Sequence, residues 1–208
     1  MTALSILTFH GLLAFIAAEL VFSLTPGPTV MLISAYGFRG GFRDAAAAIA
    51  GTQTGNTLWY LICIAGLGAL VTASPLFFHV LKLAGAAYLV WLGGSEIWTS
   101  FHAGDEHGPR LKGGPYRQAA LTQLSNPKAL LFFCALVPQF LDIHAALLPQ
   151  YAVMFLVTFL GESVILTGYG WLASHGGRIA SAQHAAWRAR ISGAVLVALG
   201  VLAALAGA

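Results

Sequence analysis

Charged residues are scarce in this sequence: they make up 8% of its 208 residues, whereas hydrophobic residues make up 58%. A soluble domain usually has about a quarter of its residues charged. The stretches 1–18, 20–38, 45–81 and 191–208 contain no Asp, Glu, Lys or Arg. Because about 20 apolar residues cross the hydrocarbon core of a bilayer, this scarcity excludes an ordinary soluble domain and predicts an integral membrane protein.

The sequence also lacks the motifs of an enzyme or of a nucleotide-driven pump. It has no nucleophile triad, phosphate-binding loop or nucleotide fold. The cluster from His102 to His107 lies in the longest connector and lacks the spacing of structural zinc sites. We therefore expect no enzymatic activity, no cofactor and no metal. The net charge of +3 comes mostly from short connectors, so we expect no nucleic-acid binding either.

The apolar stretches predict six membrane-spanning helices, at about 7–37, 45–70, 76–98, 116–140, 150–174 and 190–207. Basic residues follow the first, third and fifth spans: Arg39, Arg43, Arg110, Lys112, Arg117, Arg178, Arg188 and Arg190. The connectors after the second and fourth spans contain no Lys or Arg. Since basic connectors mark the cytoplasmic side of a membrane, both termini are predicted to face away from the cytoplasm.

Two of the predicted spans contain a helix-breaking motif. Leu24-Thr25-Pro26-Gly27-Pro28 interrupts the first span, and Ser125-Asn126-Pro127-Lys128 interrupts the fourth. In lipid such a break is costly unless it lines a cavity or is buried in protein. Paired breaks in corresponding segments of two halves are typical of secondary transporters, whose substrate site lies at the breaks.

The two breaks belong to an internal repeat. Three matches recur about 100 residues apart: 82–86 with 190–194, 55–57 with 161–163, and 25–26 with 126–127. Three spans are an odd number, so the two halves enter the membrane from opposite sides. This predicts an all-α, single transmembrane domain, 1–208, built from inverted three-helix repeats at about 1–100 and 114–208. Chance similarity between spans rich in Gly, Ala and Leu is the alternative.

The breaks supply candidate substrate-binding residues. A half-helix that begins at a break presents N–H groups and partial positive charge, which bind carboxylates. Asn126 is predicted to cap the second half-helix and Pro127 to begin it. The candidates for substrate binding are Thr25, Pro26, Gly27, Pro28, Thr29, Asn56, Asn126, Pro127 and Lys128. In the simpler alternative, the prolines only kink two packed helices, and Lys128 lies along the surface.

Glu19 and Glu162 are the acidic residues most deeply embedded in apolar sequence. A carboxylate inside a membrane is expensive and is a functional candidate by default, and burial makes proton binding easier. Both are therefore candidates for proton coupling. The alternative is that each lies near the end of a span, in water or paired with Lys82 or Lys128.

Cys63 and Cys134 raise a rival function, a membrane thiol–disulfide electron carrier. Such a carrier needs two exposed, activated thiols that can meet. The two residues lie in the second and fourth predicted spans, which the repeat does not relate. A buried cysteine more often packs as a small hydrophobic side chain, so packing is the preferred interpretation.

The chain resembles the lysine exporter/homoserine-threonine resistance (LysE/RhtB) family over essentially its whole length. The resemblance is carried by 24–28, the Gly-rich connector near 37–41, 82–89, 126–129 and 137–140. One departure is Thr29, where many members have an acidic or amide residue.

The resemblance implies export of amino acids or close derivatives across the bacterial inner membrane by a multi-pass carrier. Proton exchange is the expected coupling, and both termini are expected to be periplasmic. The implied partners are the lipid bilayer, an amino-acid substrate and a proton, with a homo-oligomer left open. Export of another small metabolite or cation on the same scaffold is a further alternative.

Overall fold

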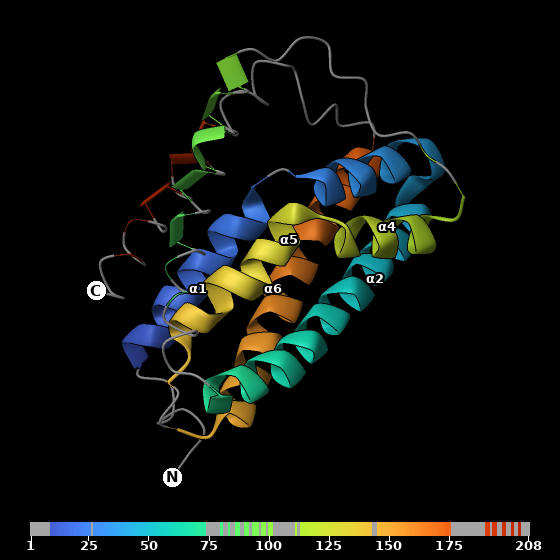
Figure 1. Cartoon of the computed structure of the whole chain (residues 1–208). Helices are drawn as coiled ribbons and strands as arrows, with labels where there is room; N and C mark the ends of the chain where they lie inside the picture. Colours follow the sequence, from blue (N-terminus) through green and yellow to red (C-terminus); the bar gives the residue numbers. More distant parts are fainter. Residues whose placement is uncertain are drawn as a thin grey trace.

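A computed structural model describes residues 9–25, 27–73, 111, 113–142 and 145–175, with single positions between 80 and 101 and between 190 and 204. The described chain is helical and contains no strand, which confirms the predicted all-helical class (Figure 1). Its elements are α1 (Phe9–Leu24), α2 (Pro28–Ala73), α4 (Pro115–Leu124), α5 (Pro127–Leu131), the π-helix η2 (Phe132–Leu136), the 3-10 helix η3 (Val137–Phe140) and α6 (Leu147–Ser174). The third and sixth predicted spans lie mostly outside the described residues.

Helix α2 contains a sharp turn at Gly41. This residue has φ 75° and ψ −175°, a conformation that glycine adopts without steric cost. The chain reverses its direction there, so the second part of α2, after Gly41, runs back along the bundle (Figure 1). The turn separates the first two predicted spans at the Gly-rich connector, with Arg39 and Arg43 on either side.

Two pairs of consecutive helices meet at an angle. Helix α1 ends at Leu24 and α2 begins at Pro28, whereas α4 ends at Leu124 and α5 begins at Pro127. Each pair bends by 52°. Proline suits the first position of a helix because its missing N–H would have no partner there. Asn126 accepts a hydrogen bond from the Lys128 backbone N at 3.0 Å, which confirms the predicted cap.

The described helices have the length and surface of membrane spans. Helix α6 is long and apolar enough to cross a bilayer, and so is each bent pair taken together. Large apolar side chains are exposed at four-residue spacing along one face of α6, at Leu156, Leu160 and Val164. Such a face would aggregate in water, so it fits contact with lipid.

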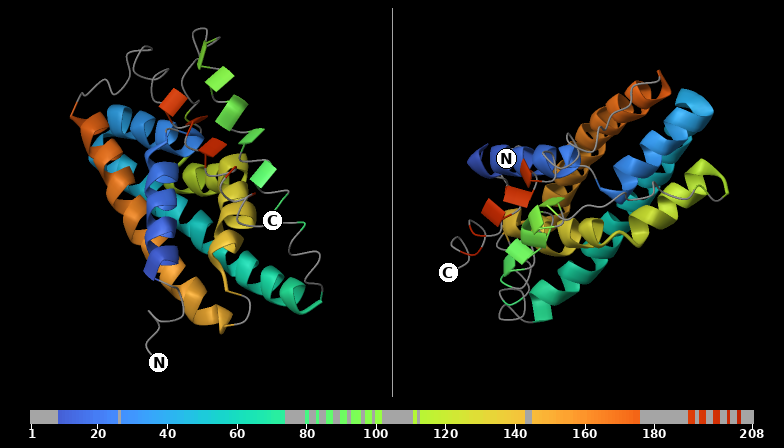
Figure 2. Two further views of the ribbon diagram at one scale, coloured as in Figure 1. Left: turned by 90° about the vertical axis from the view of Figure 1, so that its left-hand side faces the viewer. Right: turned by 90° about the horizontal axis from the view of Figure 1, so that it is seen from above.

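Helix α6 lies between α1 and the second part of α2 (Figures 1 and 2). Glycines of α2 let this helix approach α4 closely. A Cβ at Gly51 would overlap the Tyr116 carbonyl of α4, and one at Gly55 would lie 2.9 Å from Cβ of Gln123. These small residues therefore bring α2 and α4 together.

Candidate functional site

A layer of polar side chains crosses the interior between two apolar clusters. Along α6, Tyr151 and Met154 belong to the first cluster and Leu166 belongs to the second. Thr158 and Glu162 lie between them on the same helix. Buried polar groups are costly unless they are hydrogen-bonded, so the partners of this layer define the candidate site.

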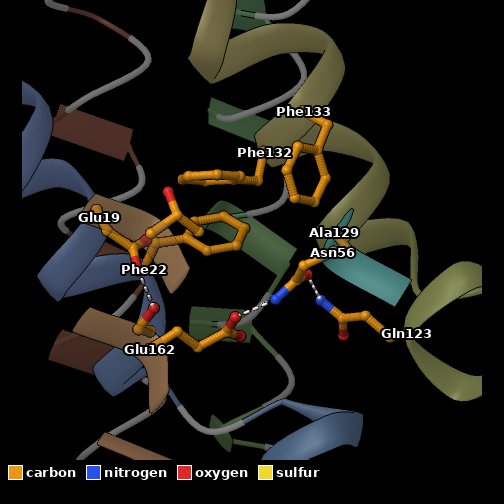
Figure 3. Close-up of a pocket in the computed structure, with 10 residues that line it drawn as sticks. Glu19, Phe22, Asn56, Gln123, Ala129, Phe132, Phe133 and Glu162 are labelled. Atoms are coloured by element: carbon orange, nitrogen blue, oxygen red, sulfur yellow. Dashed lines mark hydrogen bonds between the residues drawn. The ribbon is translucent and has the colours of Figure 1, made fainter. Parts of the chain in front are cut away.

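A chain of hydrogen bonds joins the polar layer across five helical segments. The Asn126 amide donates to the Thr29 hydroxyl at 3.3 Å, and this hydroxyl donates to Gln123 Oε1 at 2.6 Å. Gln123 Nε2 donates to Asn56 Oδ1 at 2.6 Å, and Asn56 Nδ2 donates to the Glu162 carboxylate (Figure 3). The chain thus connects both bends of the main chain to a carboxylate on α6.

The two predicted proton-coupling residues line one small cavity. Glu19 is only 2% exposed and accepts a hydrogen bond from Ser23 at 2.8 Å. Glu162 is half-buried and lines the same cavity (Figure 3). Glu19 therefore lies in the interior, not in water at the end of a span. Pairing with Lys82 lies outside the described residues.

The cavity has one polar and one aromatic side. Its volume is about 20 Å³, which accommodates about one water molecule. The polar side consists of Glu19, Glu162, Ser23, Asn56, Gln123 and Thr158, and the other side of Phe22, Ala129, Phe132 and Phe133. An amino acid is larger than this space, so the side chains around it would have to move apart to admit one.

Lys128 adds a positive charge to the site. It is only 8% exposed, and its Nζ donates to the Thr25 carbonyl at 2.9 Å. The same Nζ lies 4.7 Å from the centroid of the Phe22 ring, within the range of a cation–π contact. Lys128 thus points inward between the two bends, and the alternative that places it along the surface is wrong.

The remaining candidates divide into buried and outward-facing residues. Thr25, Thr29, Asn56 and Asn126 are buried, whereas Gly27 is half-buried and Pro28 and Pro127 are exposed on the outer side. Pro26 lies outside the described residues. Pro28 and Pro127 therefore shape the bends and do not line the cavity.

The predicted carboxylate nest at the second bend is largely occupied. The Lys128 backbone N–H donates to the Asn126 side chain, and the Leu130 N–H donates to the Asn126 carbonyl at 3.0 Å. These two donors are therefore already used inside the protein. The expectation of free N–H groups there is wrong for both residues.

Several residues of the site were missed by reasoning from sequence. Gln123 is 5% exposed at the centre of the hydrogen-bond chain. Its position three residues before Asn126 places it near the break on a helix, which was an available signal. Phe132 and Phe133 gave no signal, because aromatic residues are common throughout membrane spans.

The two cysteines are closer together than the sequence suggested. The Cys63 thiol donates to the carbonyl of Phe133, the residue directly before Cys134, at 3.4 Å. The fold therefore brings the two cysteines near each other, although the repeat does not relate their spans. Cys63 is nevertheless only 4% exposed, which does not suit a thiol that exchanges with outside partners.

A model of the LysE type translocator family matches residues 20–207. The chain belongs to this family. The homoserine/homoserine lactone efflux protein of Salmonella typhi is 35% identical over 170 residues, 80% of this chain and 82% of that protein. The leucine efflux protein of Enterobacter sp. (strain 638) is 31% identical over 128 residues, 59% of each chain. An uncharacterized membrane protein of Vibrio cholerae serotype O1 is 34% identical over 96% of this chain and 98% of that protein. No solved structure matches the chain.

Family membership confirms the resemblance seen in the motifs. The chain is a LysE type translocator with amino-acid efflux proteins among its relatives. The polar layer is therefore the candidate site of a membrane transport protein.

Proposed function

We propose that this chain is a secondary carrier that exports amino acids or close derivatives across the bacterial inner membrane in exchange for protons. One observation carries the proposal: two carboxylates and a lysine lie inside the helical bundle, where both helix pairs bend. Ionisable residues inside a membrane domain usually mark a substrate or proton pathway. Relatives named for the efflux of homoserine and of leucine support amino acids as the cargo.

The site matches the chemistry of a zwitterion. The carboxylates of Glu19 and Glu162 suit an α-ammonium group, and the ammonium of Lys128 suits a carboxylate. The aromatic side of the cavity suits the apolar part of a side chain. In this assignment the substrate binds between the two bends, and the same carboxylates carry the coupling proton when the substrate has left.

Each bent pair forms one broken span in this proposal, and the two halves form an inverted repeat within a single domain, 1–208. Three features support this inverted-repeat arrangement. The two bends are equal, at 52°. Asn56 and Glu162, which the repeat pairs, are hydrogen-bonded to each other.

The third feature is a glycine contact between the third and sixth predicted spans. A Cβ at Gly93 would meet the Gly193 carbonyl and Val197, and one at Gly193 would meet the Gly93 carbonyl and Ile97. Each glycine thus meets the glycine of the other span and the residue four positions after it. Two antiparallel helices related by a two-fold axis produce this reciprocal pattern. In this arrangement the cavity lies between the two halves, where alternating access would open it to each side of the membrane in turn.

The proposal is tested by transport in proteoliposomes. Wild-type protein should move L-homoserine or L-leucine, and an imposed pH gradient should drive accumulation. The decarboxylated amines should compete weakly, because they lack the group that Lys128 binds. Lys128→Met should lower the rate by about tenfold or more, since a hydrogen bond to a charged group is worth about 1.5–3 kcal/mol.

Arg117→Met is the matched control, because Arg117 is an exposed basic residue on α4 away from the cavity. It should leave the rate nearly unchanged. Equal losses in the two variants, or equal competition by amines and amino acids, would place the site elsewhere.

The position of Cys63 beside the residue that precedes Cys134 is the one observation that favours the thiol–disulfide carrier. Its decisive test is removal of both thiols.

A further inference from the structure

Gln123 occupies the junction of the hydrogen-bond chain. Its Oε1 accepts from the Thr29 hydroxyl and its Nε2 donates to Asn56, so both ends of the amide are used. Its backbone carbonyl accepts a hydrogen bond from the Trp59 indole at 3.4 Å. An amide bonded at both ends has a single favourable orientation, because its oxygen only accepts and its nitrogen only donates.

The close approach of two helices places this amide. Gly55 has no side chain, so Cβ of Gln123 packs against it, and one residue later Asn56 faces the Gln123 amide. Asn56 in turn divides its Nδ2 donors between Gln53 Oε1, at 3.2 Å, and Glu162. With its Oδ1 held by Gln123, Asn56 presents its nitrogen, and not its oxygen, to the carboxylate.

We propose that Gln123 is a positioning residue that acts through Asn56 on Glu162 and links the state of the two bends to this carboxylate. The linkage follows from the chain of hydrogen bonds, because a movement of Thr29 at the first bend releases one end of the Gln123 amide. Asn126 at the second bend acts on the same end through its bond to the Thr29 hydroxyl. The freed amide no longer fixes Asn56. Glu162 then loses the hydrogen bond from Asn56. The ionisable side chains near Glu162 include those of Glu19 on α1, Lys128 on α5 and Tyr60 on α2.

This inference rests on the proposed function, since it assigns Gln123 a part in coupling substrate movement to the proton. It predicts that loss of the amide uncouples the two fluxes without removing the groups that bind the substrate. Gln123→Met keeps the length and volume of the side chain and removes both hydrogen bonds. Gln118→Met is the matched control, because Gln118 lies on the same helix and accepts instead from the Tyr36 hydroxyl at 2.6 Å.

Two measurements are made on each reconstituted protein. Infrared spectroscopy follows the stretching band of Glu162, which is assigned by its loss in Glu162→Gln. A dye inside the vesicles reports protons while labelled L-homoserine or L-leucine reports substrate. Gln123→Met should shift the Glu162 band and lower the ratio of protons to amino acid by about fivefold or more. Gln118→Met should leave the band and the ratio unchanged.

An unshifted band and a wild-type flux ratio in Gln123→Met would overturn the inference, as would equal effects in the two variants. If Gln123→Met does not insert, Thr29→Val decides. It removes the donor to Gln123 at nearly constant volume and should shift the same band, and an unshifted band there also overturns the inference. A wild-type protein that moves neither amino acid contradicts the proposed function, and the infrared band still decides the role of Gln123.

Discussion

At the scale of single residues, the interior charges are each held by a specific partner. Glu19 accepts from Ser23, Glu162 accepts from Asn56, and Lys128 donates to a backbone carbonyl. Removing charges from water costs several kcal/mol per ion, which hydrogen bonds only partly offset. A membrane domain could avoid this cost with apolar side chains, so the presence of these groups is itself an argument for a transport role.

The cysteines give the first prediction at this scale. Cys63→Ala together with Cys134→Ala should leave amino-acid transport largely intact, because both thiols serve packing in the proposed carrier. We expect a loss of about 1 kcal/mol in stability, from the buried volume that Cys63 fills. Transport and thermal unfolding of the double variant check this. Normal insertion with no remaining activity would revive the thiol–disulfide carrier.

Residue patterns predicted the charged part of the site but not its full lining. Glu19 and Glu162 were found because a charge is conspicuous in apolar sequence, and Lys128 was found because it belongs to the second helix-breaking motif. Gln123 and Phe132 became visible only when the packing of α4 and η2 placed them beside the cavity. A glutamine in a membrane helix signals a partner, yet the sequence does not say which helix provides it.

At the scale of helices, the ends near the prolines were predictable and the interior of the fourth span was not. Proline fixes its own backbone, so the starts of α2 and α5 follow from local sequence. The predicted span 116–140 is instead divided into α4, α5, a π-helix and a 3-10 helix. Such changes in hydrogen-bond register depend on neighbouring helices, and no residue pattern announces them.

Two glycines of α2 give a prediction at this scale. Alanine usually stabilises an exposed helix position relative to glycine by about 0.5–1 kcal/mol, and Gly66→Ala should do so, since nothing lies within 4 Å of its added Cβ. Gly51→Ala should destabilise the protein by about 1–3 kcal/mol, because its Cβ overlaps the Tyr116 backbone, which cannot move without shifting α4. Unfolding of the two variants in detergent measures the difference. Equal effects would mean that α2 and α4 do not touch there.

At the scale of the whole molecule, the described helices have two distinct ends (Figures 1 and 2). One end holds the turn at Gly41, the start of α4 and the end of α6. The Tyr36 hydroxyl contacts the Gly113 carbonyl there at 3.1 Å, and a Cβ at Gly37 would lie 2.9 Å from the Gly170 carbonyl. The opposite end holds the connection between η3 and α6, where the Gln150 side chain bonds both backbone groups of Asp142 at 2.9 Å.

The distribution of charge between these ends predicts the orientation of the molecule. Arg39, Arg43 and Arg117 belong to the first end, and basic residues mark the cytoplasmic side. In the variant that lacks both native cysteines, Ala146→Cys should react in intact cells with a maleimide that cannot cross the membrane. Gly114→Cys should react only after the cells are permeabilised, although its side chain also points into open space. Labelling of position 114 from outside would contradict this orientation and would place the end that holds Gly41 outside the cytoplasm.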